Sequence, residues 1–129
     1  MESTSGEVTA SSAQPDPKQA VVSMAVESWR FARLFSRLLQ KIDIAEQQRY
    51  ANQFNFFLKS MEENVERAGM RLVNLVGQPY DPGMAASAIN LVDFAPDDAL
   101  VVEQMIEPII MNKDGVVKQG TIVVGKVSR

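Results

Sequence analysis

The stretch from Lys18 to Ala68 contains neither glycine nor proline. These are the two residue types that disfavour helix interiors most strongly, so the whole stretch is compatible with helix. Pro17 precedes it and Gly69 follows it, which matches the preference for proline in the first turn of a helix and for glycine just after its end. The sequence therefore predicts a helical arm over residues 17–68.

Two apolar stripes run along this arm. Members of the first are spaced by four and three residues, a coiled-coil period that places them on one helix face; they are Met24, Ser28, Phe31, Phe35, Leu38, Ile42 and Ala45. The second stripe follows in a different phase and consists of Phe54, Leu58, Met61, Val65 and Ala68. Helices of this kind are stabilised mainly by burying their apolar face. The arm is therefore expected to pack against other helices, as a coiled coil or a helical bundle.

The phase of the stripe changes over residues 46–49, which two helices or one bent helix would both explain. Asp43-Ile44-Ala45-Glu46 has the form of a capping box, with Asp in place of the usual Ser or Thr. We therefore expect a helix to begin near Asp43. The preceding residues 1–16 are rich in Ser, Thr, Gly and Pro and contain little that could be buried, so a disordered tail is predicted there.

From Met70 onward, short β-branched segments alternate with turn residues, which is typical of strands. Asn112-Lys113-Asp114-Gly115 predicts a hairpin turn, because glycine accepts the positive φ that such turns require. The predicted strands are 70–76, 87–94, 100–106, 109–111, 116–118 and 121–127. The expected fold class is α+β, with long amphipathic helices at the N-terminal side followed by a small all-β head over residues 69–129.

The composition excludes several classes of function. The 129 residues include no histidine and no cysteine, so Ser-His and Cys-His catalysis and sulfur- or imidazole-based metal sites are excluded. The net charge is −3, which disfavours broad binding to nucleic acid or anionic membranes. We expect a cytoplasmic, non-enzymatic protein with no catalytic residues, no cofactor and no metal. It should work by binding another protein, not nucleic acid or a membrane.

Two further features of the arm have more than one interpretation. Arg30, Arg33, Arg37 and Lys41 share a helix face, which could bind an anion or a partner, although a solvated face opposite the apolar stripe is the preferred interpretation. Trp29 lies one residue away from the stripe. It is interpreted either as a core residue or as an aromatic at a dimer contact, with a slight preference for the contact.

The order of landmarks from Lys59 to the C-terminus resembles the GrpE family, the nucleotide exchange factors of DnaK-type chaperones. The residues that carry this resemblance are Lys59-Ser60-Met61, Val65 and Gly69-Met70-Arg71-Leu72-Val73 at the junction of helix and head, then Gly77-Gln78-Pro79-Tyr80-Asp81-Pro82. The segments from Met105 to Gly115 and from Val116 to Val124 are similar to the last strands of the family, with Lys118 as the basic residue before the Val-rich strand.

The resemblance implies a homodimer in which helices of two chains pack together and each head binds the ATPase domain of a DnaK-type chaperone. The implied dimer interface contains Phe31, Phe35, Leu38, Ile42, Phe54, Leu58 and Met61. The implied partner-binding residues are Tyr80, Asp81, Lys118, Thr121, Val123 and Val124. The alternative function is a dimeric adaptor or scaffold protein that binds a different partner through its β head and moves no nucleotide.

Overall fold

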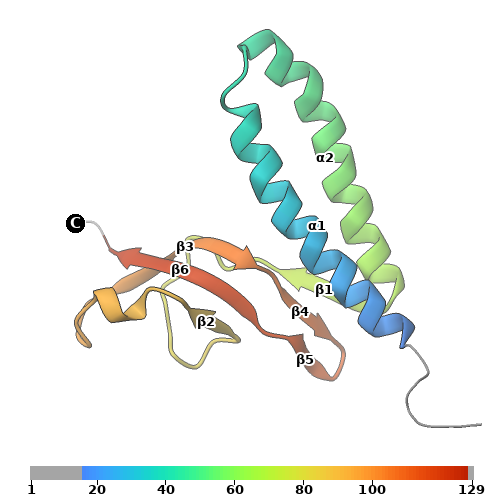
Figure 1. Ribbon diagram of the computed structural model, residues 1–129. Helices are drawn as coiled ribbons and strands as arrows, with labels where there is room; N and C mark the ends of the chain where they lie inside the picture. The colour runs from blue at the N-terminus through green and yellow to red at the C-terminus, as the bar shows by residue number, and fades with distance from the viewer. Residues whose placement is uncertain (1–15, 128–129) are drawn as a thin grey trace, which may run out of the picture.

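The computed structural model describes residues 16–127, which form a helical hairpin attached to a β-rich region (Figure 1). The hairpin consists of α1 (Pro17–Leu39) and α2 (Ile44–Arg67). Six strands and one short 3-10 helix follow it in sequence. The α+β class is confirmed, whereas the predicted tail lies outside the described residues except for Asp16.

The two helices begin where the sequence predicts, but only one of them has a side-chain cap at its start. Asp16 caps α1, because its side chain accepts a hydrogen bond from the Lys18 amide at 2.9 Å. Asp43 stands at the cap position of α2, as predicted, but its side chain makes no capping bond, so the capping-box interpretation is wrong. Gln47 instead donates its side-chain amide to the Ile42 carbonyl at 3.1 Å. Of the two alternatives for the arm, the structure has two separate helices.

Two three-stranded sheets make up the β-rich region. The first has the order β1-β4-β5, with both pairs antiparallel. The second has the order β2-β6-β3, in which β2 runs parallel to β6 and β3 antiparallel to it. The bounds of the strands are β1 Met70–Val73, β2 Ala86–Ala88, β3 Leu100–Glu107, β4 Ile109–Asn112, β5 Gly115–Lys118 and β6 Gly120–Lys126.

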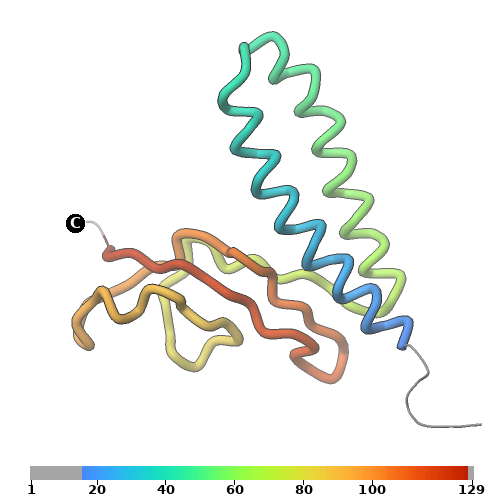
Figure 2. Tube along the Cα trace, in the orientation of Figure 1, coloured from blue at the N-terminus to red at the C-terminus, as the bar shows by residue number. Residues whose placement is uncertain are grey.

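Both sheets share one long bent ribbon, made of β3 and β4 on the outward path and β5 and β6 on the return (Figure 2). Only Pro108 separates β3 from β4, and only Gln119 separates β5 from β6. A Cβ on Gly120 would lie 2.9 Å from the Glu107 carbonyl oxygen, so this corner requires a residue without a side chain. The predicted turn at the far end is confirmed, with Asn112 paired to Gly115 and a φ of 129° at Gly115.

Two strand predictions were too long. The segment 87–94 is strand only as far as Ala88, and Leu91–Asp93 form the 3-10 helix η1. The Asn90 side chain explains the end of the strand, because it bonds both the amide and the carbonyl of Val124, at 3.0 and 2.8 Å, where a backbone ladder would otherwise continue. β1 ends at Val73 instead of Val76, and there the Asn74 side chain accepts from the Val76 amide.

The apolar residues form two cores. In the first, the base of the hairpin packs on β1 and β4; its buried members are Val22, Ala25, Val26, Val65, Met70 and Ile110. In the second, side chains of the ribbon are covered by β2 and the loops; its buried members are Leu100, Val102, Met105, Ile109, Ile122 and Val124. The hairpin base thus belongs to a core shared with the first sheet, while the rest of the hairpin extends away from the β-rich region (Figure 1).

Candidate protein-binding surfaces

Helix α1 has two apolar faces. The covered face consists of Val22, Ala25, Val26, Trp29 and Ala32, and all of its members except Trp29 are buried. The first four pack in the cores that the helix shares with the β-rich region. The open face carries the part of the predicted stripe that lies in α1, and three of its large side chains are more than half exposed: Met24 by 70%, Phe31 by 59% and Leu38 by 53%. Within residues 16–127, no other segment covers them.

An aromatic cluster joins the open face of α1 to α2. Phe35 is half-buried between Phe31 and Phe54, with ring centroids 6.1 and 5.2 Å away. Among the residues assigned to a dimer interface, Phe31, Leu38 and Ile42 are exposed, Phe35, Phe54 and Leu58 are half-buried, and Met61 packs against the first core. Other exposed apolar side chains of the hairpin are Leu34, Ile44, Tyr50, Phe56 and Phe57. The hairpin therefore presents several exposed apolar side chains among its charged and polar ones.

The same helix is fastened to β3 by polar contacts. The Trp29 indole donates to the Met105 carbonyl at 2.9 Å, and Arg33 donates to the Gln104 side-chain oxygen at 2.7 Å. Trp29 also packs against the second core, which agrees with the core interpretation and not with the preferred dimer contact. Arg33 and Arg30 both reach β3 from this basic face, although the Arg30 side chain is still 54% exposed.

A groove lies beside these contacts, where the hairpin leaves the sheets. Its apolar lining comes from Trp29, Phe54, Leu58, Met61 and Leu72. Arg33 and Arg37 line it from α1 and Glu62 lines it from α2. The groove encloses about 540 Å³. Because its lining has charges of both signs, it does not indicate which kind of ligand or partner would bind there.

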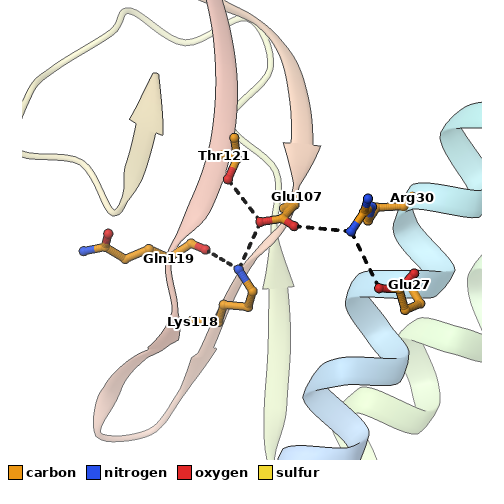
Figure 3. A network of polar contacts seen from close by, with 6 residues as sticks. All are labelled: Glu27, Arg30, Glu107, Lys118, Gln119 and Thr121. Carbon is orange, nitrogen blue, oxygen red and sulfur yellow. Dashed lines mark hydrogen bonds and ion pairs between the residues drawn. The ribbon is translucent and has the colours of Figure 1, made fainter. Parts of the chain in front are cut away.

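Glu107, the last residue of β3, is at the centre of a polar network that joins α1 to the ribbon (Figure 3). Its Oε1 accepts from Lys118 Nζ at 3.2 Å and from Thr121 Oγ1 at 3.1 Å. Its Oε2 lies 3.9 Å from Arg30, which also faces Glu27 at 3.6 Å. The network connects α1, β3, β5 and β6 through one carboxylate.

These contacts lower the pKa of Glu107 below its ordinary value. The largest cause is the hydrogen bond from Lys118, while desolvation acts in the opposite direction, and Thr121 and the charges of Lys118 and Arg30 lower it further. The carboxylate is therefore ionised at neutral pH. It holds the two cations in place on the side of the ribbon that faces α1.

The implied partner-binding residues lie at two ends of the second sheet. Lys118 and Thr121 lie beside Glu107, where β6 begins. Tyr80 lies where β3 begins, because its amide donates to the Leu100 carbonyl at 2.9 Å, and Leu100 pairs with Lys126. The two places are five positions apart along β6, from Thr121 to Lys126, or about 17 Å of strand. Asp81 is exposed next to Tyr80, and its side chain accepts from the Gly83 amide at 3.1 Å.

Val123 and Val124 point to opposite faces of β6, as neighbours in a strand do. Val124 is 1% exposed and packs in the second core, so its side chain is not available to a partner. Val123 is half-buried. Of the pair, only Val123 could add side-chain contacts to a binding surface.

The sequence did not predict the exposed apolar group formed by Ile89, Leu91 and Val92, which lies just before η1 and in its first two residues. Val92 is 93% exposed. In the sequence this segment is similar to a strand with one buried face, because apolar residues are concentrated in 87–94. The 3-10 turn directs them outward instead.

No group of three or more Asp or Glu side chains within residues 16–127 could hold a metal ion. No helix in this part of the chain has the length and apolarity needed to cross a membrane. The sequence matches no protein-family model, and the searches of curated proteins and of solved structures find no similar protein.

Proposed function

We propose that this chain is a dimeric nucleotide exchange factor of the GrpE type, which binds the ATPase domain of a DnaK-like chaperone and promotes the release of ADP. The observation that carries the proposal is a helical hairpin with an open apolar face, joined directly to a small β-rich head. This arrangement agrees with the arm and head that the family resemblance implies.

The open face supports the dimer. Burying an exposed Phe or Leu side chain is worth about 1.5–3 kcal/mol, and Phe31 and Leu38 are both more than half exposed in the single chain. Two hairpins packed face to face would cover the aromatic cluster of Phe31, Phe35 and Phe54. The helices, 23 and 24 residues long, have the length of a four-helix bundle built from two chains.

The head supports the contact with the chaperone. Lys118 and Thr121 offer polar groups at one end of the second sheet, and Tyr80 and Asp81 offer them at the other. A factor accelerates exchange only if it binds the open form of the nucleotide cleft more tightly than the closed form, because equal affinity shifts no population. The chain itself makes and breaks no bond.

The test is the rate at which a fluorescent ADP leaves a DnaK-type chaperone after addition of excess unlabelled nucleotide. We expect the chain to accelerate release at least about ten-fold, which corresponds to roughly 1.4 kcal/mol of preference for the open form. Lys118→Glu should reduce the acceleration while the dimer mass stays unchanged. Lys113→Glu is the matched control, since Lys113 is exposed in the turn between β4 and β5. A release rate that the wild-type chain leaves unchanged refutes the proposal.

A dimeric adaptor is the second candidate, and an exposed apolar group on the head favours it. Ile89, Leu91 and Val92 form this group, away from the network of Lys118 and Thr121, and groups of this kind are common at protein contacts. An adaptor would bind its partner through the head and leave the ADP release rate unchanged. Val92→Asp would then weaken that binding, whereas the exchange proposal expects little effect from it.

A further inference from the structure

Glu107 is placed where the hairpin and both sheets meet (Figure 3). Its neighbours on the ribbon, Lys118 and Thr121, are two of the four polar residues that the proposed function assigns to the contact with the chaperone; Tyr80 and Asp81 are the others. Thr121 is the cross-strand partner of Glu107 in the β3–β6 ladder, so the two side chains are adjacent by register. Both carboxylate oxygens of Glu107 are engaged, one by the ribbon and one by Arg30 of α1.

The ammonium of Lys118 is held from two sides. An ammonium has three N–H donors, and here one is directed to Glu107 at 3.2 Å and a second to the Gln119 carbonyl at 3.0 Å. No acceptor among residues 16–127 takes the third, and the side chain is 32% exposed. A lysine side chain that is ordered before binding loses less conformational entropy when a partner arrives.

We infer that Glu107 is a positioning residue for the chaperone contact: it fixes Lys118 and Thr121 on the head so that the remaining N–H of Lys118 is ready for an acceptor oxygen of the partner. This inference rests on the proposed function and deepens it. Glu107 acts through Lys118 and does not touch the partner.

A purely structural role for Glu107 makes a different prediction. Through Arg30, the carboxylate also helps to hold α1 against β3, and a loss of that contact would affect every surface of the head equally. If Glu107 acts through Lys118, its replacement should matter only while Lys118 is present. A double-mutant cycle measures this dependence directly.

The experiment compares the affinity of the full chain for the ATPase domain by calorimetry in four variants: wild type, Glu107→Gln, Lys118→Gln and the double variant. Glu107→Gln keeps the size of the side chain and removes its charge, and we expect it to weaken binding about five-fold, the effect of releasing one ordered side chain. In the Lys118→Gln background, the same change should alter affinity by less than about two-fold. An equal loss in both backgrounds overturns the inference.

The matched control is Glu103→Gln. Glu103 lies on the same strand, is exposed, and forms no ion pair among residues 16–127. Glu103→Gln therefore makes the same change of net charge outside the network, and the affinity of this variant for the ATPase domain should equal that of the wild type. A five-fold loss in this control would assign the effect to net charge and would contradict the positioning role.

A second measurement needs no partner. The rate of acetylation by a water-soluble reagent, read for each lysine by mass spectrometry, reports how firmly each amine is engaged. We expect Lys118 to react more slowly than the exposed Lys113 in the wild type, and to become several-fold faster in Glu107→Gln but not in Glu103→Gln. An unchanged Lys118 rate in Glu107→Gln overturns the positioning role.

The two measurements separate the inference from the function on which it rests. If the wild-type chain does not bind the ATPase domain at all, the proposed function fails and the inference fails with it. If the wild type binds but the cycle is additive, only the inference fails. If the wild type binds, the cycle is non-additive and Lys118 is acetylated faster in Glu107→Gln, both the proposed function and the positioning role are supported.

Discussion

The two apolar faces of α1 differ in the size of their side chains and in their surroundings. Apart from Trp29, the covered face is built from small and β-branched side chains, such as Val22, Ala25 and Val26, and lies on the sheets. The open face has larger ones, Met24, Phe31 and Leu38, and extends into solvent in the single chain. Small residues allow a helix to approach a sheet closely, whereas large side chains on an exposed face provide the area that contact between two proteins requires. The comparison separates residues that stabilise the monomer from residues available to a partner.

The largest effect is expected on the covered side. Ile110 of β4 is fully buried in the core that the hairpin base shares with the first sheet. Ile110→Ala should lower the free energy of unfolding by about 3–4 kcal/mol, because it removes buried methyl groups and leaves a cavity. Urea denaturation followed by circular dichroism measures this loss. The matched control is Ile89→Ala, the same truncation at a side chain 62% exposed, which should change stability by less than about 0.5 kcal/mol.

The open face should show the opposite pattern, with little effect on the fold and a large effect on association. We expect Phe31→Asp to weaken the dimer at least about 100-fold, or roughly 2.7 kcal/mol, because it places a charge within the interface twice, once from each chain. Sedimentation equilibrium measures the dissociation constant. Val92→Asp introduces the same charge at an exposed apolar residue of the head and should leave the dimer intact. A wild-type chain that stays monomeric at high concentration contradicts the dimer altogether.

Replacing Trp29 measures how much its contact with β3 stabilises the packing of α1 on the β-rich region. Trp29→Phe retains an aromatic ring and removes the N–H that donates to the Met105 carbonyl. We expect a loss of about 1–2 kcal/mol in the free energy of unfolding, because the partly buried carbonyl loses its side-chain donor and the smaller ring packs less well. The same denaturation experiment measures it. A variant as stable as the wild type would mean that this contact adds nothing to the attachment of α1.

The smallest effect is expected from the charge network at the edge of the covered face. Since the pKa of Glu107 lies below its ordinary value of 4.5 in the folded protein, its ionised form stabilises the fold at pH above that value. This contribution is lost as the pH falls through the lowered folded-state pKa. Glu107→Gln should therefore cost about 1 kcal/mol or less at pH 7, and the difference from the wild type should disappear in acid.

Unfolding by urea at a series of pH values from 7 down to 3 measures this difference. Glu103→Gln, on the same strand and outside the network, should show no such pH dependence. A difference between Glu107→Gln and the wild type that stays constant down to pH 3 would assign the effect to packing and not to charge.

Local signals in the sequence predicted much of the fold correctly. The turn at Asn112 to Gly115, the helix end at Gly69 and the helix start after Asp43 depend on residues near one another in the chain, and each is present. The segment 87–94 was predicted wrongly because Asn90 bonds to Val124, a residue 34 positions away. A periodic pattern carries no information about such a distant partner.

The candidate surfaces were less predictable than the fold. Phe31 and Leu38 were identified by their spacing, and both are exposed. The covered face of α1 has its own helical spacing, but its small residues gave a weaker signal than the aromatic stripe beside it. Glu107 was missed because its importance comes from Arg30, Lys118 and Thr121, which three different elements bring together. The register of β3 against β6 places Thr121 opposite Glu107, while Arg30 and Lys118 reach the same carboxylate from α1 and β5.

The bent ribbon has a consequence for the order in which the chain folds. Its two arms are joined by one tight turn, so residues 100–126 can pair through contacts that are close in sequence, whereas the hairpin base must bring Val22 to Ile110. Local pairing loses less chain entropy and forms faster. We expect the ribbon amides to become protected first in pulsed hydrogen exchange, before those of β1 and β2. Simultaneous protection of all six strands would contradict this order. If the ribbon forms first, as we expect, the corners at Pro108 and Gln119 set its bend before the helices pack against it.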